Sequence, residues 1–425
     1  MTVEHPDLLA DLEARGLIHD STDRDELRRH IANDAVGIYY GCDPTADSLH
    51  VGNLIGLIML RRFQDAGHRA IPLAGGATGM VGDPSGRSEE RNLLDDDVLD
   101  HNVACIKAQL ANVIDLDDDG LGVLVDNREW TETMSVLDFL RDVGKHVTVN
   151  QMLARESVKM RLESERGISF TEFSYMLLQA NDYLELYDRY GCTIQVGGSD
   201  QWGNILSGVD LVRRTRRTTV HAFSWPLLTA SDGSKLGKTT GARVWLSAER
   251  TSPYQFRQHW MQVADETIGA QLRTFSLRPL VDIEALLGEH AEAPQRRVAQ
   301  RALADEMVTL IHGAAAAAGA AEAADLLFAK DPTNASAEAL EVLRNEIDSI
   351  TVPAADVGDP VPLFVAAGLT DSNGDTRRQL AQGALTVNGD VLTADADLAG
   401  VAPLHGRFLM LRRGKKRHAL VELAT

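Results

Sequence analysis

Residues 36–76 open with VGIYYG (36–41) and continue through LHVGNLIGLIMLRRFQDAG (49–67) to HRAIPLAGG (68–76). The two outer runs are short and apolar, which is typical of strands, whereas the middle run has helical periodicity and ends at Gly67. GVLVDN (122–127) and CTIQVGG (192–198) are two more predicted strands. Because strands that alternate with helices pair in parallel, we predict an α/β fold with a doubly wound parallel sheet.

The second half of the chain has a different character. Residues 250–345 are predicted to be helical throughout and include an alanine-rich tract at 312–327. Pro and Gly then cluster in TVPAADVGDPVP (351–362), which is typical of a linker. The last segment predicts two short helices, followed by a hairpin whose turn is Asn388–Gly389.

Length and composition exclude several classes of protein. The chain has 425 residues, 44% of them hydrophobic and 24% charged, so it is neither collagen-like nor wholly disordered. No window has the roughly 18 apolar residues of a membrane span, and the N-terminus lacks a signal-peptide pattern, so we expect a cytoplasmic protein. The three cysteines, at positions 42, 105 and 192, are too scattered for a disulfide framework or a zinc cluster, and we predict no dedicated metal site.

Charge is unevenly distributed along the chain. The formal net charge is −20, yet residues 361–425 hold eight Lys/Arg and six Asp/Glu, a net charge of +2. A generic nucleic-acid-binding surface is basic, so any RNA partner must be bound by local basic patches. Arg213, Arg214, Arg216 and Arg217 form a second basic cluster, for which a solvated helix end is the alternative interpretation.

A first candidate site follows the first strand, in DPTADSLHVGN (43–53). His50 and Asn53 are three residues apart, so they share one face at the start of a helix. The free N–H groups of a helix N-terminus favour phosphate, and Gly52 lets a ligand approach the backbone. A surface helix with a capping serine and an incidental histidine remains an equal alternative at this point.

A second candidate site is the loop DGSKLGKTT (232–240). Two lysines three residues apart, with a glycine between them, suit a loop that closes on polyphosphate. The loop is not a P-loop, because three residues rather than four separate Gly233 from Gly237. An exposed lysine loop is the alternative, and the neighbouring Gly and Thr residues favour phosphate binding.

A third candidate site is the predicted helix at residues 171–190. Tyr175, Gln179 and Asp182 form one polar stripe on an otherwise apolar helix. The solvent face of an amphipathic helix is the commoner explanation of such a stripe. The next segment, QVGGSDQWGN (195–204), adds further donors and acceptors beside a glycine-rich strand end, which favours a binding site.

Five motifs in this order resemble the bacterial tyrosyl-tRNA synthetases, and the resemblance covers essentially the whole chain. They are DPTADSLHVGN, GGATGMVGDPSG, YMLLQANDY, QVGGSDQWGN and KLGKT. HVGN and KLGKT match the two family signatures usually written HIGH and KMSKS. Arg87 stands where members of the family often have lysine, so the charge is kept but the hydrogen-bond geometry differs.

The resemblance implies a two-step reaction on L-tyrosine, Mg²⁺-ATP and tRNA(Tyr), with electrostatic and positional catalysis and no covalent enzyme intermediate. The catalytic residues implied at the phosphates are His50, Asn53, Thr45, Lys235, Lys238 and Thr239. The implied nucleotide site also includes Gly41, Asp43, Gly52, Arg87, Gly198 and Asp200. Magnesium would arrive with ATP, and no tightly bound cofactor is implied.

The resemblance also assigns the tyrosine-binding and tRNA-binding residues. Tyr175, Gln179 and Asp83 would hold the substrate ammonium, and Tyr39 and Asp182 would bind its phenolic hydroxyl. Asn127, Gln195 and Gln201 would line the pocket or orient these groups. The tRNA phosphates would be contacted by basic residues in two clusters, Arg213, Arg214, Arg412, Arg413, Lys415 and Lys416.

The implied architecture has three domains and a linker. A Rossmann-like catalytic domain (1–245, with an insertion for the tRNA acceptor end and the dimer contact at about 100–190) is followed by an α-helical anticodon-region domain (246–345), a linker (346–358) and an S4-like RNA-binding domain (359–425). A homodimer is expected, with one tRNA spanning both subunits. The alternatives are the sister enzyme for tryptophan and an inactive relative that only binds RNA.

Overall fold

The computed structural model describes residues 7–85, 95–116, 121–163, 167–227, 243–329, 331–414 and 416–424. They form two compact units, one of Met1–Arg250 with Gln262–Leu303, the other of Thr251–Met261 with Ala304–Thr425. No described helix is both long and apolar enough to cross a membrane.

The first unit contains the predicted parallel sheet. Its strand order is β3-β2-β1-β4-β5, and every adjacent pair is parallel. The strands are β1 (Gly37–Cys42), β2 (Arg69–Ala74), β3 (Val125–Asp126), β4 (Cys192–Gly198) and β5 (His221–Trp225). The chain winds outward from β1 in both directions, so the point where the strand order reverses lies between β1 and β4. Ligands bind at the carboxyl ends of the strands at this position in doubly wound folds.

Two strands differ from expectation. The third predicted strand, residues 122–127, is regular only at Val125–Asp126, with one isolated bridge from Gly122 to Ala70. The edge strand β5 was not predicted, although all five of its residues are buried. Its sequence, HAFSW, lacks the continuous apolar run by which the other strands were found.

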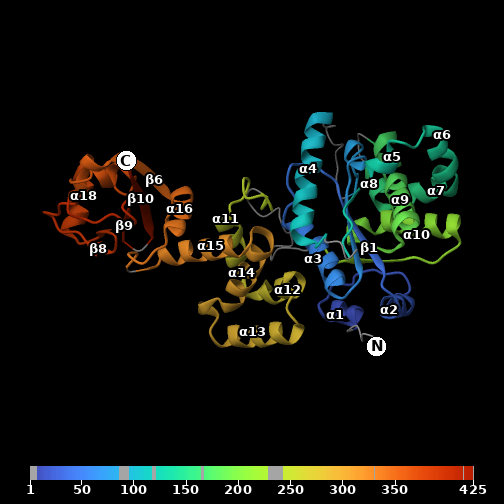
Figure 1. The fold of residues 1–425 in the computed structure, drawn as a ribbon, viewed down its shortest axis with the longest axis horizontal. Coiled ribbons are helices and arrows are strands. Elements are labelled where there is room, and N and C mark those ends of the chain that lie inside the picture. Colours follow the sequence, from blue (N-terminus) through green and yellow to red (C-terminus); the bar gives the residue numbers. More distant parts are fainter. Residues whose placement is uncertain are drawn as a thin grey trace. The chain divides into compact units, whose positions relative to one another are not determined.

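Helices cover both faces of the sheet (Figure 1). On one face lie α3 (Val51–Asp65) and α4 (Asp96–Val113), and on the other α9 (Phe170–Tyr190) and α10 (Trp202–Arg216). Adjacent residues of a strand point to opposite faces. Tyr39 therefore packs into the core beneath α9, whereas the ring of Tyr40 lies against Gly56 of α3.

Local signals determine where the two central helices begin and end. His50 caps α3, and the chain leaves the helix at Gly67 with a φ of 86°. Ser169 caps α9 by accepting from the Glu172 N–H, and Gly191 ends the helix in the left-handed conformation. Glycine adopts this conformation without strain.

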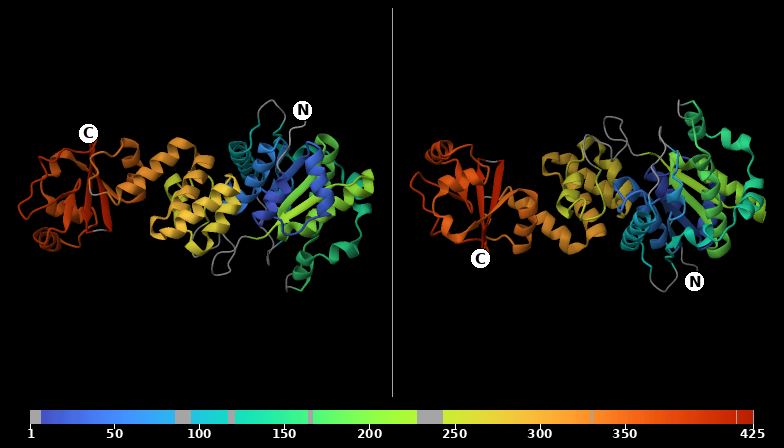
Figure 2. Two further views of the ribbon diagram at one scale, coloured as in Figure 1. Left: turned by 90° about the horizontal axis from the view of Figure 1, so that it is seen from below. Right: turned by 90° about the horizontal axis from the view of Figure 1, so that it is seen from above.

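The remaining helices of this unit lie around the sheet and the four helices that cover it. Figure 2 shows the segment from α5 to α8, in teal, at the periphery of the unit. The helices are α1 (Leu8–Ala14), α2 (Arg24–Asn33), α5 (Arg128–Thr131), α6 (Val136–Asp138), α7 (Val149–Leu153), α8 (Glu156–Leu162), α12 (Asp265–Phe275), α13 (Leu280–Glu292) and the first part of α14 (Val298–His312). Short 3₁₀ or π turns are η1 (Thr78–Met80), η2 (Phe139–Val143), η3 (Gly144–His146), η4 (Ser199–Gln201) and η5 (Pro294–Arg296).

The second unit contains a smaller mixed sheet of order β6-β10-β9-β7-β8. Its strands are β6 (Asp348–Pro353), β7 (Leu385–Val387), β8 (Asp390–Val391), β9 (Phe408–Arg413) and β10 (Arg417–Ala424). Its helices are α11 (Pro253–Met261), the end of α14, α15 (Ala314–Leu326), α16 (Ala337–Glu346), α17 (Pro360–Ala366) and α18 (Asn373–Ala381), with the 3₁₀ turn η6 (Ala354–Asp356).

The predicted hairpin is confirmed. Val387 pairs with Asp390 across the turn, and Asn388 and Gly389 both have positive φ, 48° and 94°. Two consecutive residues with positive φ are the requirement of the tight hairpin turn that Asn-Gly favours.

The interpretation of residues 346–358 as a linker is wrong in part, because some of these residues form a strand. Residues 348–353 form β6, which pairs in parallel with β10, and Ile350 and Val352 pack on the core of the small sheet. Leu340 and Leu343 of α16 are buried against Phe408 of β9. Helix α16 and strand β6 are thus part of the second unit. Their apolar side chains are covered by β9 and β10, which lie about 70 residues further along the chain.

Candidate active site

A hydrogen-bonded network joins the carboxyl ends of β1 and β2 to α9. Asp43 follows β1, and its Oδ1 accepts from Thr78 Oγ1 at 2.7 Å, while its Oδ2 accepts from the Tyr175 hydroxyl at 2.9 Å. Gly75 permits this approach, since a Cβ there would lie 2.4 Å from both Asp43 Oδ1 and Thr78 Oγ1. The structure therefore brings Asp43 and Tyr175 together, as expected for one site.

Asp182 is the buried end of the same network. Its carboxylate accepts from Asn127 Nδ2 at 3.0 Å and from the Trp130 indole N–H at 2.8 Å. The Asn127 amide also donates to Thr78 Oγ1 at 2.9 Å. Burial raises the pKa of Asp182 to about 7, although the two donated hydrogen bonds act in the opposite direction.

Two buried polar atoms in the described structure have no hydrogen-bond partner at this site. The Tyr39 hydroxyl is one, in a side chain that is 2% exposed, and Gln195 Oε1 is the other. Burial, followed by the charge of Asp182, raises the pKa of Tyr39. A buried polar group without a partner is costly, so these atoms are suited to meet polar atoms of a bound ligand.

The polar stripe of α9 continues into a second cluster. Asp83 is 9% exposed and accepts from Gln201 Nε2 at 2.6 Å. Asn204, at the start of α10, donates to Gln179 Oε1 at 3.2 Å and lies 3.5 Å from Asp83 Oδ1. Asp83, Gln179 and Gln201 thus meet through Asn204, and the α9 stripe faces a buried site rather than solvent.

The start of α3 is closed by a reciprocal cap. His50 Nδ1 accepts from the Gly52 N–H at 3.0 Å, and Asn53 Oδ1 accepts from the His50 N–H at 3.2 Å. Burial, and then the charge of Arg243, lowers the pKa of His50, which keeps the ring neutral at physiological pH. The capping residue is His50, not Ser48, and Gly52 is needed because a Cβ would lie 2.8 Å from the His50 ring.

Several predicted residues lie outside the described part of the chain. These are Arg87, Lys235, Lys238, Thr239 and Lys415. The described residues that flank the KLGKT segment nevertheless lie at the site. The Trp225 ring is 5.5 Å from that of Tyr40, and Trp245 forms a β-bridge with His50.

The other residues of the expected nucleotide site are exposed or half-buried at the same edge of the sheet. Gly41 is the next-to-last residue of β1 and Thr45 follows the strand, while Gly198 ends β4 and Asp200 lies in the next turn. They therefore flank the point where the strand order reverses.

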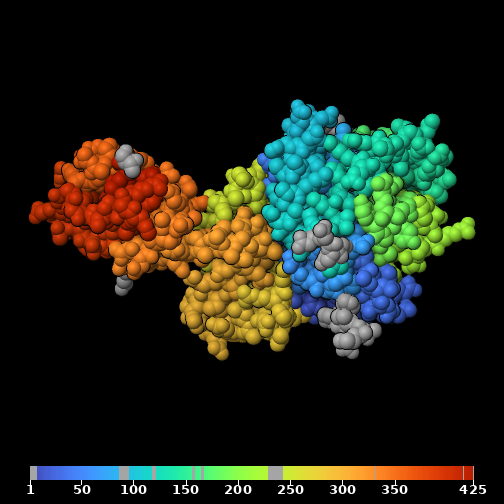
Figure 3. All heavy atoms as spheres, viewed as in Figure 1, coloured from blue at the N-terminus to red at the C-terminus, as the bar shows by residue number. Residues whose placement is uncertain are grey.

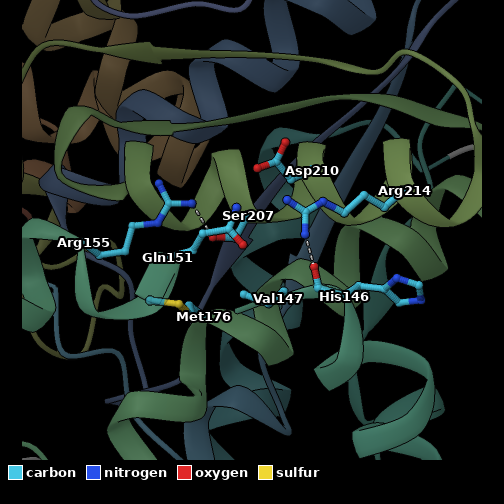
Figure 4. A pocket seen from close by; sticks show the side chains of 8 residues that line it. All are labelled: His146, Val147, Gln151, Arg155, Met176, Ser207, Asp210 and Arg214. Atoms are coloured by element: carbon cyan, nitrogen blue, oxygen red, sulfur yellow. Dashed lines mark hydrogen bonds between the residues drawn. The ribbon is translucent and has the colours of Figure 1, made fainter. Parts of the chain in front are cut away.

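The arginines expected to bind tRNA all have partners within their own units. Arg213 pairs with Asp210 at 2.7 Å, and Arg214 donates to the His146 carbonyl. The latter bond closes a pocket between α7 and α10 (Figure 4). Its lining includes three basic side chains and is made of His146, Val147, Gln151, Arg155, Met176, Ser207, Asp210 and Arg214.

The basic cluster of the small sheet is also anchored. Arg412 donates to the Gly414 carbonyl at 2.8 Å, and Arg413 donates to the Leu369 carbonyl at 2.8 Å. Arg413 also lies 3.3 Å from Asp375. Lys416 is exposed.

Three residues of the network were missed from the sequence. They are Thr78, Trp130 and Asn204. They lie in η1, α5 and α10, shortly after a predicted strand, which was an available signal, but nothing local indicates their partners.

Comparison with known proteins agrees with this geometry. The family model described as tRNA synthetases class I (W and Y) matches residues 32–329, more than two thirds of the chain. The chain belongs to this family. A second model, the tyrosine–tRNA ligase SYY-like C-terminal domain, matches residues 339–421 of this class I synthetase.

Individual relatives span nearly all of this class I synthetase. It is 45% identical to a tyrosine–tRNA ligase of Bacillus caldotenax over 98% of this chain and 100% of that one. It is also 45% identical to a tyrosine–tRNA ligase of Acidothermus cellulolyticus, over 98% of this chain and 99% of the other. A solved C-terminally truncated mitochondrial tyrosyl-tRNA synthetase of Aspergillus nidulans is 35% identical, with a TM-score of 0.70, covering 76% of this chain and 94% of that one.

Proposed function

We propose that the protein is a tyrosine–tRNA ligase, which activates L-tyrosine with ATP and transfers the tyrosyl group to the 3′ end of tRNA(Tyr). The observation that carries this proposal is the unpartnered Tyr39 hydroxyl in the buried core next to α9. Together with the Asp182 carboxylate, it offers a donor and an acceptor for one phenolic hydroxyl. Both groups are buried, so they discriminate strongly between ligands with and without that hydroxyl.

The other end of the substrate would lie at the entrance to the same network. We assign Tyr175, Gln179 and Asp83 to the ammonium group. Each presents an oxygen acceptor, Tyr175 and Gln179 are one turn apart on α9, and Gln179 and Asp83 are linked through Asn204. Asn127 and Gln201 orient two of the carboxylates by donating to Asp182 and Asp83. Gln195 is assigned to the pocket wall because it is the strand neighbour of Tyr39, and its unpartnered carbonyl oxygen lies close to Gly208 of α10.

The first chemical step needs positioning and charge stabilisation. An oxygen of the tyrosine carboxylate bonds to the α-phosphorus of ATP, and the bond from that phosphorus to the pyrophosphate oxygen breaks. Pyrophosphate leaves with its Mg²⁺. The lowered pKa keeps His50 neutral, and because its Nδ1 accepts from the Gly52 N–H, the ring proton is on Nε2 and can be donated to a phosphate oxygen. No described side chain is needed as a nucleophile.

The nucleotide would occupy the edge of the sheet between β1 and β4. Six residues are assigned to the nucleotide because they lie at this edge of the sheet. They are Gly41, Asp43, Gly52, Asn53, Gly198 and Asp200. Thr45 also lies at this edge, and Arg87, Lys235, Lys238 and Thr239 are assigned to the phosphates from their motifs alone. Magnesium is assigned to the ATP that it accompanies, as part of the substrate.

In the second step, a ribose hydroxyl of the terminal tRNA nucleotide attacks the carbonyl of the adenylate, and AMP leaves. We assign phosphate contacts to Arg213 and Arg214 in the first unit and to Arg412, Arg413, Lys415 and Lys416 in the second. The paired arginines must exchange an internal partner for a phosphate, whereas the exposed Lys416 needs no such exchange. We further propose residues 1–245 as the catalytic domain, the helices from residue 246 up to α16 as the helical domain, and residues 359–425 together with α16 and β6 as the RNA-binding domain.

A tyrosine-dependent ATP–pyrophosphate exchange assay tests the function directly. Exchange with tyrosine and not with tryptophan is the expected result. Exchange with tryptophan would support the sister enzyme, and the absence of any exchange would support an RNA-binding protein without catalytic activity.

We also propose a homodimer, through an apolar surface on the segment from α6 to α9. Figure 3 shows this segment at the molecular surface, in teal and green. It carries eight exposed apolar side chains, Val136, Leu137, Leu140, Val149, Leu153, Met160, Leu162 and Phe170. Leu137 and Phe170 are 77% and 79% exposed. Eight exposed apolar side chains within one segment of about 35 residues are more than single scattered surface residues and are typical of a subunit interface.

Leu137→Asp tests the dimer. Each residue of an interface between two identical surfaces occurs twice in it, so the variant places two charges among apolar side chains and is expected to sediment as a monomer at concentrations where the wild type is a dimer. Val281→Asp, at an equally exposed valine of α13, is the control and should not change the mass. A monomeric wild type, or a dimeric Leu137→Asp, would contradict the proposed interface.

A further inference from the structure

One buried ion pair at the start of α9 has no part in the network described above. Arg161 of α8 and Glu172 of α9 are each 3% exposed. The pair is bidentate, with Nη1 to Oε1 at 3.0 Å and Nη2 to Oε2 at 2.7 Å. Among the ion pairs formed by described residues, it is the one in which both side chains are almost completely shielded from water.

Stability alone is a poor explanation for such a pair. Removing two charges from water is costly, and apolar side chains of similar size often serve as well. What a bidentate arginine–carboxylate pair does provide is a defined geometry, because the planar guanidinium and the carboxylate accept only a narrow range of relative positions.

The position of the pair indicates what that geometry controls. Glu172 is in the first turn of α9, where Ser169 Oγ accepts its N–H. Arg161 also donates to the Gly167 carbonyl at 3.1 Å, so it holds both the turn before α9 and the first turn itself. Tyr175 comes three residues after Glu172, and its hydroxyl donates to Asp43.

The pair also lies next to the apolar surface. Met160 and Leu162 flank Arg161 and are 48% and 50% exposed, while Phe170 is the first residue of α9. Arg161 therefore points inward from a helix whose neighbouring side chains point outward.

We propose that Arg161 and Glu172 are positioning residues for tyrosine binding. By fixing the first turn of α9 on α8, they hold the Tyr175 hydroxyl on Asp43, and with it the acceptors that meet the substrate ammonium. This inference rests on the proposed role of Tyr175, and neither residue of the pair contacts the substrate.

The test compares four variants in pyrophosphate exchange with the full-length enzyme. Arg161→Met breaks the pair, Arg161→Lys keeps the charge without the bidentate geometry, and Arg161→Met with Glu172→Leu replaces the pair by apolar groups. We expect the KM for tyrosine to rise at least tenfold in the first and third variants and less in the second, while the KM for ATP changes less than twofold. Arg273→Met is the control, because Arg273 and Glu284 form a bidentate but more exposed pair between α12 and α13, and the KM for tyrosine should not change.

Thermal unfolding and sedimentation separate positioning from stability and assembly. The apolar double variant should unfold at or above the temperature of Arg161→Met and remain as oligomeric as the wild type, yet keep the raised KM. If the double variant recovers both stability and KM, or if the variants dissociate in parallel with the change in KM, the positioning role is overturned. An unchanged KM for tyrosine overturns it as well. If Arg161→Met does not fold, the double and lysine variants decide.

Tyr175→Phe separates this inference from the site assignment on which it rests. A raised KM for tyrosine in Tyr175→Phe with a normal KM in the Arg161 variants overturns only the positioning role. A normal KM for tyrosine in Tyr175→Phe overturns the assignment of Tyr175 to the substrate. It then also overturns the positioning role of the ion pair, which acts through Tyr175.

Discussion

The Tyr39 hydroxyl is buried without a partner, and its use in substrate selection can be measured. Tyr39→Phe removes about one hydrogen bond, or about 1 kcal/mol, so the ratio of kcat/KM for tyrosine over phenylalanine should fall roughly fivefold to tenfold. Tyr183→Phe is the control, because the Tyr183 ring lies 5.4 Å from that of Tyr39 but its hydroxyl donates to the His221 carbonyl at 2.7 Å. An unchanged ratio in Tyr39→Phe would show that Tyr39 does not contact the phenol.

The raised pKa of Asp182 predicts how tyrosine binding depends on pH. With a pKa of about 7, the group is a carboxylate above neutral pH and a carboxylic acid below it. The carboxylate is the better acceptor for a phenol, so the KM for tyrosine should rise as the pH falls from 8 to 6, with little change in the KM for ATP. A KM for tyrosine that stays constant across this range would contradict the assigned role.

The same pKa has a consequence for the stability of the free enzyme. Between about pH 4 and 7 the folded state keeps a proton on Asp182 that the unfolded chain has lost. Its contribution to the free energy of unfolding therefore decreases as the pH rises through this window, by up to about 1.4 kcal/mol per pH unit. Denaturant unfolding of Asp182→Asn, which does not titrate, should lack this part of the pH dependence.

At the scale of single elements, α3 depends on a glycine in its interior. Alanine normally stabilises a helix relative to glycine by about 1 kcal/mol. At Gly56, however, a Cβ would lie 2.2–2.5 Å from three atoms of the Tyr40 ring. The Tyr40 hydroxyl also interacts with the Asn53 side chain at the start of the same helix.

Gly56→Ala should therefore lower the melting temperature and raise the KM for ATP, because the Tyr40 ring must move and Asn53 loses its neighbour. Gly269→Ala in α12 is the matched control, since its nearest contacts would be ordinary at 3.4–3.5 Å. That variant should unfold at the same or a higher temperature. Equal behaviour of the two variants would show that the Tyr40 contact is not tight.

At the scale of the whole molecule, the chain separates substrate chemistry from the basic C-terminal sheet. Every described residue assigned to tyrosine or ATP lies in the first unit, and Arg412 and Arg413 lie in the second. Truncation after residue 329 or after residue 350 should therefore keep pyrophosphate exchange, while tRNA charging falls and its salt dependence flattens. Equal loss of both activities would indicate a purely structural role for the C-terminal residues.

The two truncations should differ in stability. The fragment that ends at residue 350 keeps α16 but loses β9 and β10, so Leu340 and Leu343 lose their cover from Phe408 and Leu420. It should aggregate at lower temperature than the fragment that ends at residue 329. Light scattering during a thermal ramp measures the difference, and equal onset temperatures would show that α16 does not need the sheet.

Features that depend on neighbouring residues in the chain were predictable from the sequence alone. The parallel sheet, the α9 helix with its polar stripe and the Asn388–Gly389 hairpin agree with the structure, because strand and helix periods and positive-φ turns are local properties. The motifs after β1, β2 and β4 and on α9 likewise indicated which segments meet in the hydrogen-bonded network, since the carboxyl ends of parallel strands meet at one edge, whereas KLGKT lies outside the described residues.

Features that depend on distant residues were decided only by the tertiary structure. Strands β5 and β6 were missed because their pairing partners, rather than their own patterns, place them in sheets. Trp130 and Thr78 joined the buried hydrogen-bonded network only when β2, β3 and α9 brought their donors to Asp182 and Asp43. The local sequence does not distinguish Arg161 from an exposed helical arginine, and only its packing against Glu172 shows that it is buried. A hydrogen bond or ion pair is short-ranged in space but not in sequence, so its partner is determined by packing.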